Sequence, residues 1–359
     1  MSKFHPLKVK HVARETEDAV AISFEIPSEL KSDYKYIQGQ YLTIEQEIGG
    51  EKIRRAYSLC SSPVGNEAPT VCVKRVEGGK MSTHLNKTCK AGDTLNVMIP
   101  EGRFYTPIDA AQSKQYFLFG GGSGITPLLS IIKTVLSAEP KSKCVLLYAN
   151  KNKNSIIFKD QIDKLKDSNK GRLEVVYSLD SAGLFWSGLK GMITGDTVQK
   201  HVNKFKDNAV SQEYFICGPG GMMQVVQNAL NGMNLAKETI HVEYFTTPGS
   251  ENKKPAEATA AATQAFSGTT ELTVTIDGKT VSMSATAKKT ILNAAQDAGL
   301  DPPYSCESGI CSTCMAKVTE GSVRMIENNI LTEKEIAAGY VLTCQALCTS
   351  SVVKVEYYD

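Results

Sequence analysis

The sequence contains no long hydrophobic run and no strong excess of charge of either sign. No stretch of about 18 consecutive apolar residues occurs, and the first residues contain no apolar core of a secretory signal peptide. The chain has 40 Lys and Arg against 38 Asp and Glu residues, and this net charge of +2 does not favour nucleic acid as a partner. Internal repeats are also absent. We therefore expect a cytoplasmic protein of two or three domains, without membrane insertion and without a nucleic-acid partner.

Four cysteines near the end of the chain have a spacing that is typical of an iron–sulfur cluster. Cys306, Cys311 and Cys314 follow the pattern C-x4-C-x2-C, and Cys344 comes after a further 29 residues. Plant-type [2Fe–2S] sites have this spacing, because two irons bridged by two sulfides need four thiolates. A four-cysteine zinc site usually pairs two C-x2-C units, a disulfide would suit a secreted chain, and scattered core cysteines rarely show this pattern. We predict that these four residues are metal ligands.

Hydrophobic patterns divide the chain into three regions and a linker. Residues 1–108 contain short alternating runs, which predict an antiparallel β-barrel of six strands. Residues 109–245 alternate apolar strands with helical stretches and predict a doubly wound parallel α/β sheet. Residues 246–269 are rich in Ala, Thr, Pro and Gly, as in a flexible linker. Residues 270–359 predict an α+β domain, with a hairpin at Asp277-Gly278.

The expected elements can be given by residue number. Strands are expected at 7–13, 19–26, 41–48, 52–59, 70–76 and 94–100, then at 115–120, 143–149, 172–179, 213–218 and 239–245. Helices are expected at 126–138 and 221–233. After the linker, strands are expected at 271–277, 278–285, 315–319, 340–347 and 351–358, and helices at 290–299 and 332–339.

Two short motifs in the first region have the chemistry to bind a flavin nucleotide. In Arg55-Ala56-Tyr57-Ser58, the cation can pair with a phosphate, the aromatic ring can stack on the isoalloxazine, and the hydroxyl can reach the flavin N5 edge. Gly79-Lys80-Met81-Ser82 resembles the start of a Ser-capped helix, where N–H groups suit a pyrophosphate. Taken alone, each motif also fits an ordinary surface strand or a simple turn and cap.

Two loops in the second region have the chemistry to bind a dinucleotide. The run Gly120-Gly121-Gly122-Ser123-Gly124-Ile125-Thr126-Pro127 lies between an expected strand and an expected helix. Its glycines allow a dinucleotide to approach the backbone, and Pro127 fits a first helical turn. The run Cys217-Gly218-Pro219 likewise joins a strand to a helix. Because ligands of open α/β sheets bind at the carboxyl ends of strands, we expect both loops to flank one crevice.

Together these motifs resemble the ferredoxin–NADP reductase superfamily fused to a C-terminal plant-type ferredoxin domain. The residues 55–58 look like its R-x-Y-S motif, 100–104 like its P-x-G-x-F turn, and the two glycine loops like its pyridine-nucleotide loops. Glu243-Tyr244-Phe245 looks like the ending that closes the flavin site. Within the family, the chain is most similar to oxygenase reductases of the phenylacetyl-coenzyme A epoxidase type. Glu307 departs from the pattern, since those relatives often have a basic residue there.

The resemblance implies FAD in the barrel, NAD(P)H in the α/β domain and a [2Fe–2S] cluster in a β-grasp ferredoxin domain. It implies catalytic roles for Ser58, Cys217 and Glu243. It implies that the cofactor-binding residues are Arg55, Ala56, Tyr57, Ser58, Gly79, Lys80, Met81, Ser82, Phe245, Gly120, Gly122, Gly124, Thr126, Pro127, Ser178, Cys217, Gly218 and Pro219.

The same resemblance implies a route for electrons. A nicotinamide gives two electrons as a hydride and the cluster accepts one, so a flavin must stand between them. Electrons would pass from NAD(P)H to FAD, then singly to the cluster and on to a separate oxygenase. By resemblance this partner is the di-iron phenylacetyl-coenzyme A epoxidase.

Some alternatives stay open at this point. The partner could instead be a Rieske ring hydroxylase, an alkane or steroid hydroxylase, or a desaturase. A non-catalytic iron–sulfur redox sensor is a further alternative, although a sensor needs no flavin barrel and nicotinamide loop in series. The preferred nicotinamide also stays open: Asp180 favours an unphosphorylated ribose, whereas Lys151 and Lys153 could compensate for a phosphate.

Overall fold

A computed structural model describes residues 4–245 and 268–357 of the chain, which form two compact units. The first unit is Phe4–Phe245, and the second contains the described residues 268–357. The expected linker at 246–269 lies outside the described residues, except for its last two positions. Within the described ranges, no helix is both long and apolar enough to cross a membrane.

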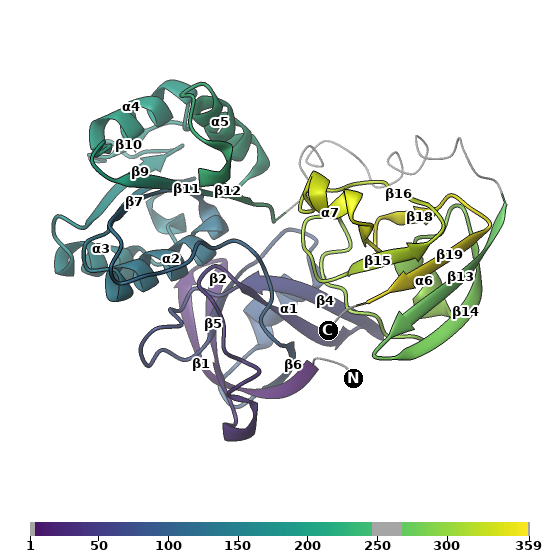
Figure 1. Cartoon of the computed structure of the whole chain (residues 1–359). Helices are drawn as coiled ribbons and strands as arrows, with labels where there is room; N and C mark the ends of the chain where they lie inside the picture. Colours follow the sequence, from purple (N-terminus) through teal and green to yellow (C-terminus); the bar gives the residue numbers. More distant parts are fainter. Residues whose placement is uncertain (1–3, 246–267, 358–359) are drawn as a thin grey trace. The chain divides into compact units, whose positions relative to one another are not determined.

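The first unit begins with the predicted antiparallel barrel (Figure 1). Its six strands are hydrogen-bonded in the order β4-β3-β6-β1-β2-β5. An isolated bridge between Leu59, directly after β4, and Val71 in β5 joins the two edge strands and closes the sheet. All six predicted strands are confirmed. The elements are β1 (Phe4–Thr16), β2 (Ala19–Glu25), η1 (Ser28–Leu30), β3 (Tyr41–Ile48), β4 (Glu51–Ser58), β5 (Thr70–Lys74), α1 (Lys80–Thr88) and β6 (Thr94–Met98).

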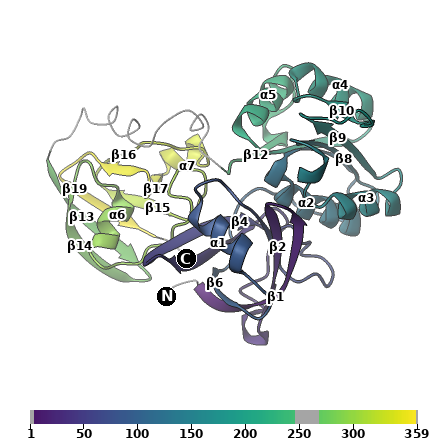
Figure 2. The same cartoon turned by 180° about the vertical axis from the view of Figure 1, so that it is seen from behind.

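The second half of this unit is a parallel sheet with helices on both faces (Figure 1, Figure 2). Its strands are β7 (Lys114–Gly121), β8 (Lys143–Asn150), β9 (Leu173–Leu179), β10 (Leu189–Lys190), β11 (Ser211–Cys217) and β12 (Ile240–Glu243). The helices are η2 (Gly122–Gly124), α2 (Ile125–Ala138), η3 (Lys153–Ser155), α3 (Lys159–Ser168), α4 (Gly195–Phe205), α5 (Gly220–Asn231) and η4 (Lys237–Thr239). The five strands predicted here are confirmed, whereas the two-residue β10 is too short to leave a pattern in the sequence.

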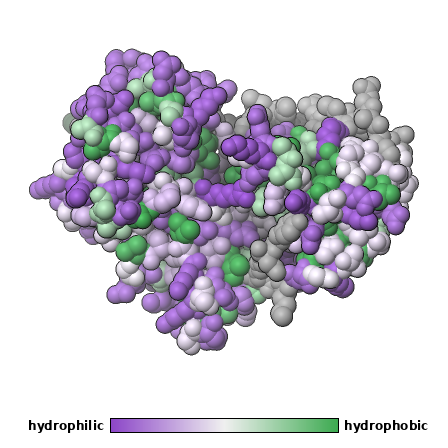
Figure 3. Space-filling view, in the orientation of Figure 1, coloured by the Kyte–Doolittle hydropathy of each residue, from purple (hydrophilic) through white to green (hydrophobic). Residues whose placement is uncertain are grey.

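Alternating side chains of β7 build both cores of the parallel sheet. Tyr116 and Leu118 pack on one side with residues of α2 and α3, and Phe117 and Phe119 pack on the other with residues of α4 and α5. This period of two is what a strand buried on both faces requires. The outer surfaces of α4 and α5 are mainly hydrophilic (Figure 3), so these helices turn their apolar sides to the sheet.

The order of the parallel strands creates a switch point between β7 and β11. The sheet runs β10-β9-β8-β7-β11-β12, so the chain leaves β7 towards β8 on one side, while β11 pairs with β7 on the other. In such sheets, ligands bind in the crevice outside the carboxyl ends of the two strands. Both predicted glycine loops follow these two strands.

The second unit is a mixed sheet with one main helix, as predicted. Its elements are β13 (Thr269–Ile276), β14 (Lys279–Thr286), α6 (Ile291–Asp297), β15 (Met315–Glu320), β16 (Val323–Met325), α7 (Glu333–Ala337), β17 (Tyr340–Leu342), β18 (Ala346–Cys348) and β19 (Val352–Glu356). The main sheet has the order β14-β13-β19-β15-β17, with β13 and β19 parallel. The predicted hairpin turn is confirmed at Asp277 (φ 50°) and Gly278 (φ 73°), both in the left-handed region.

One predicted strand of this unit is wrong in its extent. We expected a single strand over 340–347, but the structure divides it into β17 and β18, which pair in different sheets. The chain turns at residues 343–345, where Gln345 N donates to Leu342 O at 2.8 Å. Because Cys344 sits in this turn, the break in the strand carries the fourth cysteine out of the sheet.

Candidate functional site

The predicted flavin motif ends β4 and alternates between the two faces of the barrel. Arg54 is 1% exposed, donates from Nε to Glu45 Oε2 at 2.7 Å and lies over the Phe4 ring at 4.6 Å. Arg55 is exposed, because neighbouring residues of a strand point to opposite faces. The structure therefore uses Arg54 to fix the sheet, while the predicted Arg55 lies on the opposite face, in line with Ile53 and Tyr57, and stays exposed.

The serine of this motif meets the predicted glutamate from the other half of the unit. Ser58 Oγ donates to Glu243 Oε2 at 3.4 Å, and Ser58 is buried. Burial raises the pKa of Glu243 to about 8, although the hydrogen bond from Ser58 lowers it in part. The carboxyl therefore holds a proton at neutral pH and can give it up close to that pH. Two of the residues predicted to be catalytic are thus in contact.

The third of these residues lies in the adjacent strand. In the register of the parallel sheet, Cys217 at the end of β11 faces Gly120 of β7 on one side and Glu243 of β12 on the other. Its side chain is buried, and burial raises the pKa of the Cys217 thiol well above its usual range, with a smaller contribution from Glu243 in its ionised form. Cys217 is therefore a neutral thiol beside the Ser58–Glu243 contact.

The two glycine loops touch each other through their backbones. A Cβ atom on Gly124 would lie 2.1 Å from Cys217 O, and one on Gly121 would lie 2.6 Å from Pro219 Cδ. A Cβ on Gly218 would lie 2.9 Å from Gly121 N. These contacts leave no room for side chains, so the loops need glycine in order to meet at the switch point.

Gly122 differs from the other glycines of its loop. It has φ +51°, and the nearest atom to a Cβ placed there is Lys74 Nζ at 3.8 Å. The N-cap residue of α2 is Gly124 and that of α5 is Pro219, and neither has a polar side chain to cap the first helical turn. Helix N-termini of this kind fit the pyrophosphate of a dinucleotide, and the Lys74 ammonium lies near the loop before α2.

Lys74 was missed by the sequence reasoning. It ends β5, four positions before Gly78, and its Nζ also lies 3.7 Å from Asp18 Oδ2. A single lysine at a strand end gives no signal by itself, because most such residues are solvated. The three central residues of β5 are all buried, so the burial pattern of the strand gives no signal for Lys74 either. Lys74 shares a face of β5 with Cys72, which packs in the core with α2.

The predicted helix near residues 79–82 is present, but its predicted serine cap is wrong. The N-cap of α1 is Gly79, and Ser82 lies inside the helix with its Oγ accepting from Val76 N at 3.1 Å. Lys80 pairs with Glu51 at 2.6 Å, and Met81 is buried in the barrel core. The turn can therefore offer backbone N–H groups and the Lys80 charge, while Met81 serves packing.

Three further predicted residues have defined surroundings. Thr126 Oγ1 donates to Ser123 O at 3.0 Å and so fixes the glycine loop, and Pro127 is buried in the first turn of α2. Ser178 lies at the carboxyl end of β9, where its Oγ donates to Gly191 O at 2.9 Å. Phe245 follows β12 and is 37% exposed.

The four predicted cysteines come together in the second unit as two pairs. Cys306 Sγ and Cys311 Sγ are 3.1 Å apart, and Cys314 Sγ and Cys344 Sγ are 3.3 Å apart. Both distances exceed the ~2.05 Å of a disulfide bond. Within the described residues, no group of three or more His, Cys, Asp or Glu side chains has the arrangement for a single metal ion. Cys306 also contacts Cys344, so the four thiols form one group, and four thiolates are what two irons bridged by two sulfides need.

The loop around the first pair supports the same interpretation. Ser308 N donates to Cys306 Sγ at 3.4 Å, and the buried Ser305 hydroxyl has no partner among the described residues. Gly309 has φ +73°, and a Cβ there would lie 2.8 Å from Glu327 O. Donors of this kind around thiolates are what a [2Fe–2S] cluster needs. Glu307, the departure from the family pattern, is exposed beside Cys306.

Comparison with known proteins gives a match for each part of the chain. Residues 6–105 match the family described as "Oxidoreductase FAD-binding domain", residues 118–228 match "Oxidoreductase NAD-binding domain", and residues 274–349 match "2Fe-2S iron-sulfur cluster binding domain". Among solved structures, phthalate dioxygenase reductase has a TM-score of 0.61 at 22% identity, covering 99% of this chain and 100% of that one, and so shares its fold.

Curated relatives match over nearly the whole length. A component of 1,2-phenylacetyl-CoA epoxidase from Escherichia coli K12 is 38% identical, over 99% of this chain and 98% of that protein. The ferredoxin reductase component of 3-ketosteroid-9-alpha-monooxygenase from Rhodococcus rhodochrous is 34% identical, over 98% of this chain and 96% of that protein. The glycine betaine monooxygenase reductase subunit from Pseudomonas aeruginosa UCBPP-PA14 is 29% identical, over 97% of this chain and 94% of that protein.

The fold and the three domain matches define a flavin-dependent oxidoreductase. Its flavin, nicotinamide and iron–sulfur domains lie on one chain. The chain belongs to the family of oxygenase reductases in which ferredoxin–NADP-reductase-type FAD and NAD domains are joined to a [2Fe–2S] ferredoxin domain. Electrons pass from NAD(P)H to FAD and then to the [2Fe–2S] cluster. The predicted fold, cofactors and class of enzyme are confirmed.

Proposed function

We propose that this chain is the reductase component of an oxygenase of the 1,2-phenylacetyl-CoA epoxidase type. It takes a hydride from NAD(P)H and supplies single electrons to a separate oxygenase component. The E. coli relative that is a component of such an epoxidase supports this partner, with 38% identity against 34% for the steroid monooxygenase reductase. The oxygenase is expected to carry a di-iron site, as the sequence resemblance implies.

Each cofactor would be held by residues whose positions the structure describes. Arg55 would bind a phosphate of FAD and Tyr57 would stack on its ring, with the backbone and charge at Gly79-Lys80 holding the pyrophosphate. The loops 120–124 and 217–219, with Lys74 above Gly122, would hold NAD(P)H. Cys306 and Cys311 would bind one iron, and Cys314 and Cys344 the other. The domain limits at 108 and 245 also form part of the proposal.

The single observation that supports the chemistry most is the contact between Ser58 and Glu243. FAD, when bound, accepts two electrons as a hydride and releases them one at a time. Ser58 Oγ and the Glu243 carboxyl come from the two halves of the unit and meet where the flavin strand and the nucleotide loops converge. The Glu243 carboxyl, with its pKa raised to about 8, can hold a proton for the reaction and release it.

The partner is tested by reconstitution. The purified chain is mixed with NAD(P)H, phenylacetyl-CoA and the oxygenase components of a phenylacetyl-CoA epoxidase, and the epoxide is measured. A parallel reaction contains a 3-ketosteroid 9α-monooxygenase oxygenase and its steroid. We expect epoxide formation to depend on this chain and to exceed steroid hydroxylation. Faster steroid hydroxylation would assign the chain to the second partner, whose reductase is 34% identical.

A further inference from the structure

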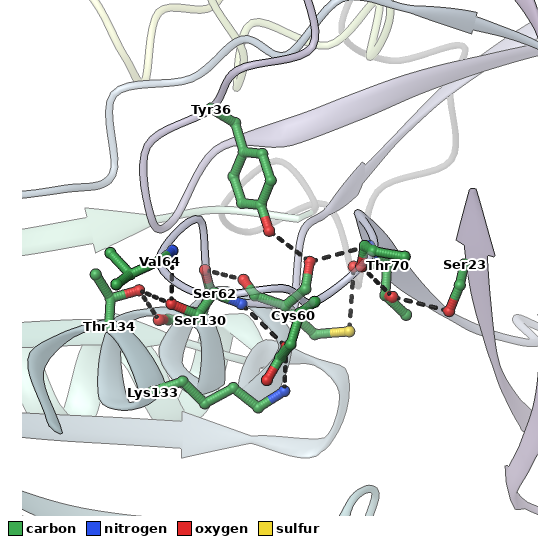
Figure 4. A network of polar contacts seen from close by, with 12 residues as sticks. Ser23, Tyr36, Cys60, Ser62, Val64, Thr70, Ser130, Lys133 and Thr134 are labelled. Atoms are coloured by element: carbon green, nitrogen blue, oxygen red, sulfur yellow. Dashed lines mark hydrogen bonds and ion pairs between the residues drawn. The ribbon is translucent and has the colours of Figure 1, made fainter. Parts of the chain in front are cut away.

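A loop directly after the flavin motif packs on the helix that begins at the nucleotide loop. This junction loop comprises residues 59–69, between β4 and β5, and follows Ser58, while α2 follows Gly124 (Figure 4). Both halves of the unit contribute to one core, in which Cys60 of the junction loop packs with Leu128 and Leu129 of α2. The junction therefore connects the element that carries the flavin motif with the element that starts at the dinucleotide loop.

Polar side chains of α2 meet this loop on one side of the helix. Ser130, Lys133 and Thr134 are three and four positions apart and therefore share a face. Ser130 Oγ donates to Ser61 O at 2.7 Å, and Lys133 Nζ lies 2.9 Å from Glu67 Oε2. In Figure 4 these side chains point from the helix towards the loop.

The hydroxyl groups form a chain of hydrogen bonds with assigned directions. Thr134 Oγ1 donates to Ser130 O at 2.7 Å, so the 3.0 Å contact between Ser62 Oγ and Thr134 Oγ1 has Ser62 as its donor. Ser62 Oγ in turn accepts from Val64 N at 3.1 Å. Ser130 is 0% exposed and Thr134 is 1% exposed.

Buried hydrogen bonds of this kind fix a register that apolar packing alone would not fix. The neighbouring contacts of α2 are between apolar side chains, which have no directed bonds and tolerate small shifts of the helix. A shift of the helix along the junction loop would break the two bonds that cross between them, from Ser130 Oγ to Ser61 O and from Ser62 Oγ to Thr134 Oγ1, and leave two buried donors without partners. The network therefore selects one position of α2, and with it one position of the Gly120–Gly124 loop, relative to Ser58.

We propose that Ser130 and Thr134 are positioning residues for hydride transfer. They act through the junction loop and set the distance between the nicotinamide held by the glycine loop and the flavin held beside Ser58. This inference rests on the proposed function, since it requires hydride transfer between these two sites. Transfer needs reacting atoms about 3–3.5 Å apart, and a 1 Å error lowers the rate by roughly a hundredfold.

The test measures flavin reduction in the complete protein loaded with FAD and cluster. Ser130→Ala removes one hydroxyl, and Thr134→Val removes the other while it keeps the side-chain shape. Anaerobic stopped-flow mixing with increasing NADH or NADPH separates the limiting rate of reduction from the dissociation constant. For both variants we expect a limiting rate on the order of tenfold lower, with FAD content and dissociation constant within about twofold of the wild type. The charge-transfer absorption between nicotinamide and flavin should weaken in parallel.

Two matched variants separate positioning from stability. Thr134→Ser keeps the hydroxyl, and we expect it to reduce at the wild-type rate. Ser142→Ala removes another fully buried serine hydroxyl, one that accepts from Lys114 N at 2.9 Å away from the junction, and should also keep the wild-type rate. Unchanged rates in Ser130→Ala and Thr134→Val, an equal loss in Ser142→Ala, or loss of bound FAD would each overturn the positioning role. A wild-type flavin that neither nicotinamide reduces would instead contradict the proposed function.

Discussion

We propose that the residues that meet at the switch point supply the proton chemistry of this molecule. The Glu243 carboxyl is surrounded by protein atoms and shielded from water. Ser58 donates a hydrogen bond to it, and the neutral Cys217 lies in the neighbouring strand. Removal of water favours the uncharged carboxyl and raises the pKa to about 8. Because a hydride brings negative charge to the site, we propose that a protonated Glu243 assists transfer and that an ionised one opposes it.

The first prediction concerns pH. Because Glu243 loses its proton as the pH rises through about 8, the limiting rate of flavin reduction by NAD(P)H should fall over that range. In Glu243→Gln this inflection should disappear and leave a lower, flat profile. The control is Glu213→Gln, a carboxyl whose pKa is lowered by hydrogen bonds from His241 and Lys114 against the effect of burial. The same inflection in Glu243→Gln would rule out this assignment.

The second prediction concerns flavin binding. Arg55→Ala should raise the dissociation constant for FAD about tenfold to a hundredfold, because hydrogen bonds to a charged group contribute roughly 1.5–3 kcal/mol. Fluorescence titration of the apoprotein with FAD measures the change. Lys52→Ala removes an exposed cation of the same strand and should leave binding unchanged. Equal affinities in Arg55→Ala and the wild type would count against a phosphate contact.

The third prediction separates the cluster from the flavin. Cys311→Ala removes one ligand of the first thiol pair, so the visible absorption of the cluster should be lost. Reduction of an artificial dye by NAD(P)H should continue, since it needs the flavin alone. Cys348→Ala, which alters a buried cysteine of the same unit outside the spacing pattern, should keep the cluster. Loss of dye reduction in a folded Cys311→Ala protein would show that the two centres do not divide the work in this way.

At the scale of elements, the sequence predicted most strands because their patterns match their burial. β7 alternates between two cores, and β4 alternates around Arg54 and Arg55, so the period of two is visible in both. The strand expected over 340–347 was wrong because its apolar pattern continues through the turn at 343–345. There Thr343 N and Oγ1 both donate to Cys314 O, at 3.1 and 3.0 Å, a tertiary contact with no local signal.

The glycine loops illustrate a second limit of the sequence. Strand, glycine run and helix were enough to predict a dinucleotide loop, but the contact of Gly124 with the other loop depends on how the strands are ordered. Lys74 was missed for the same reason, since β5 reaches the loop through the packing of the barrel on the parallel sheet. The cap of α1 was misassigned because Ser82 bonds Val76 N across the turn instead of the first helical turn.

The fourth prediction belongs to these loops. Gly124→Ala would place a Cβ 2.1 Å from Cys217 O, so the two loops must move apart. We expect weaker binding of NAD(P)H, by roughly tenfold or more, while FAD stays bound. Gly195→Ala adds a methyl group that meets Ala229 Cβ at 3.8 Å, an ordinary contact, and should leave binding unaltered. Nicotinamide titrations followed by flavin absorbance give both constants, and equal values would refute the need for this close approach.

At the scale of the whole molecule, the sequence predicted the three domains but not that the first two pack into one compact unit. Composition and motifs indicated a barrel, an α/β sheet and a ferredoxin domain, and the domain matches at 6–105, 118–228 and 274–349 agree with that order. The barrel and the parallel sheet nevertheless form one compact unit, because Ala19 and Phe104 of the barrel half share a core with α2. Small residues such as Ala19 give no sequence signal for a packed junction.

The same grouping explains why one chain can serve as a relay. The flavin motif and nucleotide loops lie within Phe4–Phe245, where the junction loop fixes their geometry, and the thiol pairs lie in the second unit. Hydride transfer therefore depends on a packed core, whereas passage of single electrons depends on the cysteine loop. A substitution that impairs hydride transfer should therefore leave electron transfer through the cluster measurable, and the reverse should also hold.

The central claim is that electron pairs from NAD(P)H enter through FAD and leave singly through the [2Fe–2S] cluster. Anaerobic titration of the fully loaded protein with NADH or NADPH, followed by visible absorption and electron paramagnetic resonance, tests it most directly. The account predicts that the flavin absorption bleaches and that the signal of the reduced cluster appears in the wild type but not in Cys311→Ala. A wild-type cluster that stays oxidised while the flavin is fully reduced would contradict it.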